Sequence, residues 1–106
     1  MDNINYSNNN DLDEIMRIDS EVVGDDNRCP YIEKVIEDGG SLVCKIEQRI
    51  IDFLIFDARF FEHSFISLVV VSPSERRKGV AKALIYAFQI YHQLKKFSHL
   101  PTYLAR

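Results

Sequence analysis

Apolar residues recur at helical spacing in two segments of the first half of the chain. In residues 11–23 (DLDEIMRIDSEVV) acids fill the opening turn, and the apolar positions follow one another roughly every three to four residues. In residues 29–40 (CPYIEKVIEDGG) a proline stands near the first helical position and a glycine pair at the end, the usual start and stop signals. These patterns predict two short helices after a brief strand around residues 4–6.

The pattern becomes extended from Ser41 onward. Residues 41–47 (SLVCKIE) and 49–61 (RIIDFLIFDARFF) are rich in β-branched and aromatic residues, and a tight turn around Glu47–Arg49 predicts a hairpin. Residues 63–72 (HSFISLVVVS) predict a third strand, whose continuous apolar run implies burial on both faces. After Gly79, apolar residues recur along one face of a long amphipathic helix that packs on the sheet. They are Val80, Leu84, Ala87, Phe88, Tyr91 and Leu94.

This order of elements predicts one α+β domain over residues 1–106, a three-layer sandwich with a mixed, mostly antiparallel sheet flanked by helices. The tail, residues 97–106 (FSHLPTYLAR), is expected to add a short strand interrupted by Pro101. With 106 residues, of which 46% are hydrophobic and 27% charged, the chain has the composition of one globular domain. No segment approaches the roughly 18 consecutive apolar residues of a membrane helix, so no membrane partner is expected.

Charge is divided unevenly along the chain. Residues 1–50 hold 12 acids and 5 bases, a net charge of −7, whereas residues 51–106 hold 4 acids and 8 bases, a net charge of +4. The acidic pI of about 5.5 disfavours nucleic-acid binding. Cys29 and Cys44 have neither metal-ligand spacing nor the density of a disulfide scaffold, so we expect no metal and a reducing, cytoplasmic location. Cys44 is expected to be a small core residue.

The beginning of the long helix is electrostatically unusual. Helix N-termini carry a positive partial charge and unpaired N–H groups, yet Arg76, Arg77 and Lys78 directly precede this one. A phosphate at this position would accept several backbone N–H bonds and neutralise the three cations. Gly79 would let the backbone come close to such a ligand, and Ala81 adds only a methyl group. The alternative is that the cations are solvated on a surface loop.

The four glycines of the chain allow neither G-x-G-x-x-G nor G-x-x-x-x-G-K-[ST], so dinucleotide and P-loop motifs are excluded. Residues 68–85 (LVVVSPSERRKGVAKALI) instead resemble the acyl-CoA-binding signature of the GNAT N-acetyltransferase superfamily. In that family a hydrophobic strand ends in V-x-P, and [RQ]-x-x-G-x-[GA] follows before a long helix. Val71-Ser72-Pro73 fits the first part, and Arg76, Gly79 and Ala81 fit the second.

The resemblance implies that acetyl-CoA is the co-substrate and that a primary amine is the acceptor. It implies that the strand backbone pairs with the pantetheine arm, that the next loop and first helical turn hold the pyrophosphate, and that Arg76 positions this loop. A strand N–H near Val69 or Val70 would be the oxyanion donor. The cofactor-binding residues would then be Val69, Val70, Val71, Arg76, Arg77, Lys78, Gly79, Val80, Ala81 and Lys82.

Many family members carry a catalytic carboxylate nine to eleven residues before the signature arginine. Phe65, Ile66 and Ser67 occupy those places here, so the usual acid is missing. Glu62 and His63 are the nearest substitutes and our candidate catalytic residues, with a plain surface turn as the alternative. The resemblance also implies that residues 20–29 (SEVVGDDNRC) border the acceptor site. Glu21, Asp25 and Asp26 in this segment have two interpretations. Either they attract the amine, or they are solvated acids of a surface loop.

Family domains continue past the long helix with further elements, so we expect a C-terminally shortened member, in which a homodimer completes the sheet. Three functions follow from these features. The first is an N-acetyltransferase acting on a primary amine. The second is a catalytically impaired module that binds CoA or dimerises. The third is an interaction protein without a ligand, in which the basic turn is only surface.

Overall fold

The computed structural model describes residues 3–60 and 63–95. The strands are β1 (Ile4–Tyr6), β2 (Ser41–Ile46), β3 (Arg49–Phe60) and β4 (His63–Val71). The α-helices are α1 (Leu12–Val23), α2 (Cys29–Glu37) and α3 (Val80–Lys95). Two single 3₁₀ turns, η1 (Asn9–Asp11) and η2 (Pro73–Glu75), precede α1 and follow β4. These elements confirm the predicted helices and strands up to α3; the strand expected in the tail lies outside the described residues.

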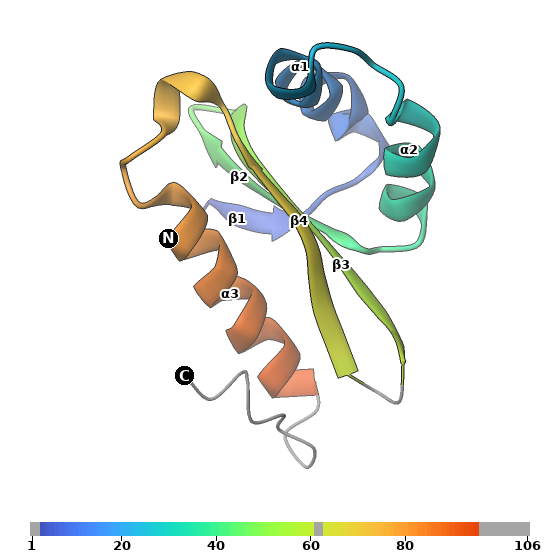
Figure 1. Ribbon diagram of the computed structural model, residues 1–106. Helices are drawn as coiled ribbons and strands as arrows, with labels where there is room; N and C mark the ends of the chain where they lie inside the picture. Colours follow the sequence, from blue (N-terminus) through green and yellow to red (C-terminus); the bar gives the residue numbers. More distant parts are fainter. Residues whose placement is uncertain (1–2, 61–62, 96–106) are drawn as a thin grey trace.

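The four strands form one sheet in the order β1-β2-β3-β4. Every pairing in it is antiparallel. Figure 1 shows α1 and α2 on one face of this sheet and α3 on the other, which confirms the predicted three-layer α+β fold. None of the described helices is long and apolar enough to cross a membrane.

The side chains of the sheet divide into two core clusters, one for each face. On the α1/α2 face, Ile15, Ile18 and Ile32 pack with strand residues that include Phe53 and Val70. On the α3 face the buried residues are Ile4, Leu42, Cys44, Ile51, Leu54, Phe56, Val80, Leu84 and Phe88. Cys44 is therefore the core residue that its strand position predicted. Burial on both faces explains the apolar run of β3 from Phe53 to Phe56. β4 differs from the prediction: Val70 is buried, Leu68, Val69 and Val71 are half-buried, and Ile66 is exposed, because β4 lies at an edge of the described sheet.

Three register shifts shape the sheet, the last of them between Asp57 and Phe60 on β3. Between Cys44 and Lys45 the register shifts, which leaves Ile51 as an extra residue on β3. A second shift pairs Ile55 with Leu68 but Phe56 with Ile66, so that Ser67 is the extra residue on β4. Bulges bend a strand and strengthen its twist. The second one separates the His63 end of β4 from its valine-rich end.

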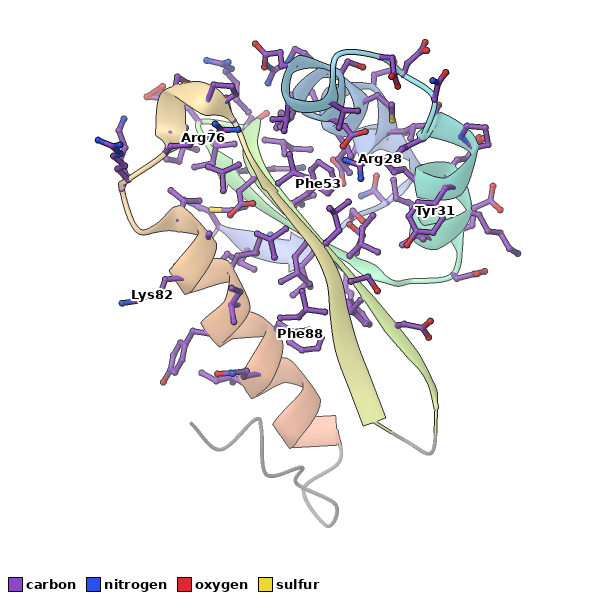
Figure 2. The ribbon with its side chains drawn as sticks, viewed as in Figure 1. Arg28, Tyr31, Phe53, Arg76, Lys82 and Phe88 are labelled. Atoms are coloured by element: carbon purple, nitrogen blue, oxygen red, sulfur yellow. The ribbon has the colours of Figure 1, made fainter. Side chains whose placement is uncertain are left out.

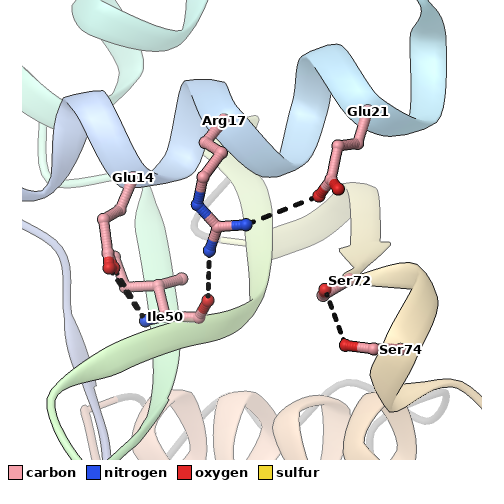
Figure 3. Close-up of polar contacts among 6 residues, drawn as sticks. All are labelled: Glu14, Arg17, Glu21, Ile50, Ser72 and Ser74. Atoms are coloured by element: carbon pink, nitrogen blue, oxygen red, sulfur yellow. Dashed lines mark hydrogen bonds and ion pairs between the residues drawn. The ribbon is translucent and has the colours of Figure 1, made fainter.

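Polar contacts fasten α1 to the sheet and to α2. The N–H of Ile50 donates to Glu14 Oε2 at 3.1 Å, and Arg17 Nη2 donates to the Ile50 carbonyl at 3.4 Å (Figure 3). Asp19, which is fully buried, accepts two hydrogen bonds from the Arg28 guanidinium at the start of α2. This ion pair holds the pKa of Arg28 above its ordinary value. The buried charge on this side of the sheet thus has its partner within the chain.

Candidate functional site

The valine-rich end of β4 lies at an edge of the described sheet. β3 pairs with it on one side, and no described strand pairs with it on the other. The N–H of Ser72 donates to the Ile51 carbonyl at 2.8 Å and so continues the ladder. Along an antiparallel edge strand, the backbone N–H and C=O groups of successive residues point alternately to the paired strand and to the open edge. The backbone groups of Val70 therefore point to β3, as those of Ser72 do, whereas those of Val69 and Val71 point to the open edge. This edge can accept an extended chain as an added strand.

The loop between β4 and α3 holds the cations that the sequence singled out. After η2, the side chains of Arg76, Arg77 and Lys78 are exposed. Arg77 has a φ of +67°, which is uncommon for a residue other than glycine. Lys78 Nζ lies 3.5 Å from Glu75 Oε1. Sequence analysis missed this carboxylate, which offsets part of the local repulsion although it stands three residues before the cation.

The first turn of α3 leaves its amides available. Among the described residues, the N–H groups of Gly79, Val80, Ala81 and Lys82 donate to no protein acceptor, and the first helical bond runs from Ala83 to the Gly79 carbonyl at 3.0 Å. Free donors at the beginning of a helix lie where the macrodipole favours an anion. No acidic residue stands in this turn. Figure 2 shows Lys82 pointing away from the sheet, whereas Phe88 points toward it.

Gly79 gives this turn its shape. Its φ of +74° belongs to the left-handed region that side chains rarely adopt. A Cβ built on Gly79 meets no atom within 4 Å, so the backbone here is open to a ligand rather than covered by protein. Val80, the next residue, is buried against the sheet. The turn is therefore anchored on one side and open on the other.

A buried acid lies beside this loop, and sequence analysis did not identify it. Asp52 on β3 is fully buried and stands directly opposite Cys44 on β2 and Val71 on β4. Neither of its carboxylate oxygens has a hydrogen-bond partner within normal geometry. Burial raises the pKa of Asp52 from 3.8 to about 7, and the nearby N–H of Phe53 opposes this shift. A single acid inside the apolar run RIIDFLIF was the signal for it.

The candidate catalytic residues lie at the other end of β4. His63 is the first residue of that strand, and Glu62 lies outside the described residues. Six residues at about 3.3 Å each separate His63 from Val69, a distance of about 20 Å along the strand. Of the positions where an acid was expected, Ile66 and Ser67 are exposed. No acidic residue stands between them and Val71.

The acids proposed for the acceptor side do not meet in one site. Glu21 forms an exposed ion pair with Arg17 at 3.4 Å. Asp25 accepts a hydrogen bond from the N–H of Asn27 at 2.9 Å, which shapes the loop between α1 and α2. Asp26 is exposed. Their negative charge surrounds the α1–α2 loop without forming a closed binding pocket.

Comparison with known proteins decides the family. The model of the acetyltransferase (GNAT) family matches residues 9–102, which include the open edge of β4 and the first turn of α3. The chain belongs to the GNAT acetyltransferase family. A GNAT-family acetyltransferase of Bacillus cereus is 38% identical and superposes with a TM-score of 0.76 over 82% of this chain and 61% of that one. The present chain thus spans less than two thirds of that relative's length.

More distant GNAT structures share the fold. An aminoglycoside 6′-N-acetyltransferase complexed with coenzyme A is 11% identical and superposes with a TM-score of 0.75 over 84% of this chain and 54% of that one. A GNAT-family acetyltransferase of Brucella melitensis in complex with acetyl-CoA is 16% identical, with a TM-score of 0.67 over 85% and 67% of the two chains. No curated protein matches the sequence significantly.

Proposed function

We propose that this GNAT chain binds acetyl-CoA and transfers its acetyl group to a primary amine. The observation that supports the proposal is that an open strand edge and a set of free amides follow one another along the chain. The open edge of β4 at Val69 and Val71 leads directly into the four unpaired amides that begin at Gly79. An extended pantetheine arm has the shape and the amide groups of an added strand. A pyrophosphate has the charge that the helix opening favours.

The cofactor-binding residues divide into two groups in this proposal. Val69, Val70 and Val71 form the strand that the pantetheine arm joins. Arg76 holds the loop, and the remaining residues surround the pyrophosphate: Arg77, Lys78, Gly79, Val80, Ala81 and Lys82. The exposed cations raise the local concentration of a ligand with several negative charges.

The chemistry follows from the position of the thioester beside Val69. A neutral amine attacks the carbonyl carbon, the C–S bond breaks, and the sulfur leaves as a thiolate. The amine nitrogen loses one proton, and the thiolate gains one. The N–H of Val69 faces the open edge and donates to the carbonyl oxygen as negative charge develops on it. Holding the amine and the thioester together accounts for most of the acceleration, since no acid of β4 stands near Val69.

Glu62 and His63 stay the candidate bases of this proposal. At about 20 Å along the strand from Val69, His63 is too far for direct proton transfer. We therefore expect His63→Gln to lower kcat by less than about tenfold, below the usual contribution of a general base. Glu62→Gln tests the neighbouring candidate. A loss of a hundredfold or more with unchanged acetyl-CoA affinity would assign a base at that end of β4.

The acceptor class is proposed from charge. The acidic segment at the end of α1 and in the α1–α2 loop, with Glu21, Asp25 and Asp26, attracts a cationic amine before it loses its proton. The test is release of the CoA thiol from acetyl-CoA with a panel of polyamines, aminoglycosides, amino acids and lysine-containing peptides. Thiol release that depends on one class of amine supports transfer, and release without any amine is only hydrolysis.

A second function is favoured by the missing acid. A chain without a carboxylate on β4 near Val69 fits a module that binds CoA or dimerises through the same edge, and does not catalyse transfer. Calorimetry that detects acetyl-CoA binding without thiol release from any amine would favour this module. Size-exclusion chromatography with light scattering tests the homodimer, which a monomer at all concentrations would exclude. The cytoplasmic location stays a prediction.

A further inference from the structure

Asp52 is a charged group in a layer that is otherwise apolar. It faces α3, because its direct cross-strand neighbour Cys44 belongs to the cluster that packs with Val80 and Leu84. Its other neighbour across the ladder is Val71, the last residue of the proposed cofactor strand. The side chain is fully buried, neither oxygen has a hydrogen-bond partner within normal geometry, and the nearby N–H of Phe53 offsets only part of the effect of burial. An ionised carboxylate is costly in such a place.

The groups that surround Asp52 do not neutralise it. From β2 it faces the Cys44 thiol, whose pKa is raised by burial and by Asp52 itself. On β4 its cross-strand neighbour is the apolar Val71, and the α3 residues buried on this face of the sheet, Val80, Leu84 and Phe88, are also apolar. Among the described residues, the nearest cations along β3 and β2 are Arg49, which is exposed, and Lys45, which pairs with Asp11 Oδ1 at 3.0 Å. The exposed cations at the start of α3 are Arg77, Lys78 and Lys82.

We propose that Asp52 is a titratable positioning residue for the cofactor, and that coenzyme A binds preferentially when Asp52 carries its proton. This inference rests on the proposed function. Protonated Asp52 leaves β4 and the first turn of α3 packed on the sheet. Ionised Asp52 has to gain water or a cation, and both routes disturb the strand end at Val71 and the turn at Val80 that the cofactor needs.

The electrostatic effect of the bound cofactor also favours protonated Asp52. Before binding, the free amides and cations at the start of α3 create a positive potential that favours the ionised carboxylate. A bound pyrophosphate cancels this potential and adds negative charge on the same side of the sheet. Binding therefore raises the pKa of Asp52, and protein that is ionised near neutral pH takes up a proton with the cofactor.

The test measures proton uptake with 3′-dephospho-CoA. This probe keeps the pyrophosphate and lacks the 3′-phosphate monoester, which itself titrates near pH 6. Calorimetry at one pH in two buffers of different ionisation enthalpy gives the number of protons taken up. We expect net proton uptake near pH 7. If binding raises the pKa of Asp52 by about 0.7, the affinity should be about fivefold lower at pH 8.5 than at pH 6.

Two variants separate the carboxylate from the rest of the protein. Asp52→Asn keeps the shape and removes the titration, so its affinity should vary little with pH and its binding should take up no proton. Asp13→Asn removes an exposed acid of α1 and should behave like the wild type. The ¹³C resonance of the Asp52 carboxyl should titrate at higher pH in the complex than in the free protein.

The outcomes distinguish the two proposals. Absence of 3′-dephospho-CoA binding at every pH would refute the cofactor site itself. Binding without proton uptake, or equal uptake in wild type and Asp52→Asn, would refute the role of Asp52 and leave the cofactor site standing. A purely structural carboxyl would change stability in the variant but would leave the pH profile of binding parallel to that of the wild type.

Discussion

The two faces of the sheet differ in whether their buried polar groups have partners within the chain. On the α1/α2 face, the fully buried Asp19 has Arg28 as its partner, and the bulge at Ile50–Ile51 has Glu14 and Arg17 on its backbone groups. On the α3 face, Asp52 has no hydrogen-bond partner, and the amides from Gly79 to Lys82 have no protein acceptor. One face is electrostatically complete within the chain. On the other face, the donors in the first turn of α3 form the site that we propose for an anion.

This difference separates scaffold from site. Buried charges that are paired contribute to a defined arrangement of elements, whereas unpaired donors at a helix N-terminus can bind an anionic ligand. Substitutions on the α1/α2 face should therefore act on stability. Substitutions on the α3 face should act on cofactor binding and on the pH dependence of stability.

The largest effect is expected from Arg28→Ala. This change leaves the Asp19 carboxylate buried without a partner, and breaking a buried pair in this way costs about 3 kcal/mol of the free energy of unfolding. Urea denaturation measures the loss. Lys34→Ala is the matched control, because its ion pair with Asp38 at 3.4 Å is exposed and contributes about 0.5 kcal/mol or less. Equal losses in the two variants would contradict the contrast between the faces.

The next effect concerns Asp52 and pH. Its native pKa of about 7 lies above the ordinary 3.8, so the native state binds more protons than the unfolded state between these values. Stability is therefore highest below the lower value and falls as pH rises through 7. Between pH 5 and pH 8 the wild type should lose about 2 to 3 kcal/mol that Asp52→Asn does not lose. Denaturation profiles that run parallel for the two proteins would exclude this assignment.

Gly79→Ala tests the loop with a smaller effect on stability. Gly79 and Gly39 have φ values of +74° and +77°, and a Cβ built on either meets no atom within 4 Å. Gly39→Ala is therefore the matched control. Alanine in the left-handed region should lower the free energy of unfolding of each variant by about 1 kcal/mol. Only Gly79→Ala places a methyl group beside the free amides, and we expect it to lower CoA affinity by about tenfold or more, as a loss of about 1.4 kcal/mol of binding would. Unchanged affinity would mean that no ligand approaches this turn.

The smallest effect is expected from a single cation. Lys78→Gln should weaken CoA binding by roughly threefold at low salt, because an exposed charge near a phosphate adds less than about 1 kcal/mol. The difference should vanish at high salt, where screening is effective within a few ångströms. Lys34→Gln, a change of the same type on α2, should leave the affinity unchanged at both salt concentrations. A salt-independent loss for Lys78→Gln would point to a direct structural role.

Most of the fold followed from periodicity. The apolar spacing of α1 and α3, the proline at the start of α2 and the β-branched runs of β2, β3 and β4 each predicted the element that the structure contains. The open loop before α3 was also visible, because three cations before a helix have no stabilising partner in the sequence pattern. The family signature then named the ligand class, which charge alone left open.

The rest depended on tertiary register. Bulges at Ile51 and Ser67 decide which strand residues share a face, and alternation along one strand does not reveal them. The β2–β3 turn uses Glu47 and Gln48 at φ values of +51° and +68°, where sequence signals favour Asn-Gly. Asp52 looked like any strand acid until its neighbours were known. The Asp19–Arg28 pair joins residues whose types alone gave no sign of contact.

The central claim is that the four free amides at the start of α3 bind the pyrophosphate of coenzyme A. The direct measurement is a ¹H–¹⁵N correlation spectrum of the ¹⁵N-labelled protein during a titration with CoA. We expect saturable shifts that are largest for Gly79, Val80, Ala81 and Lys82, with further shifts at Val69 and Val71 on the edge of β4. No shift at millimolar CoA, or shifts confined to other parts of the chain, would contradict this claim.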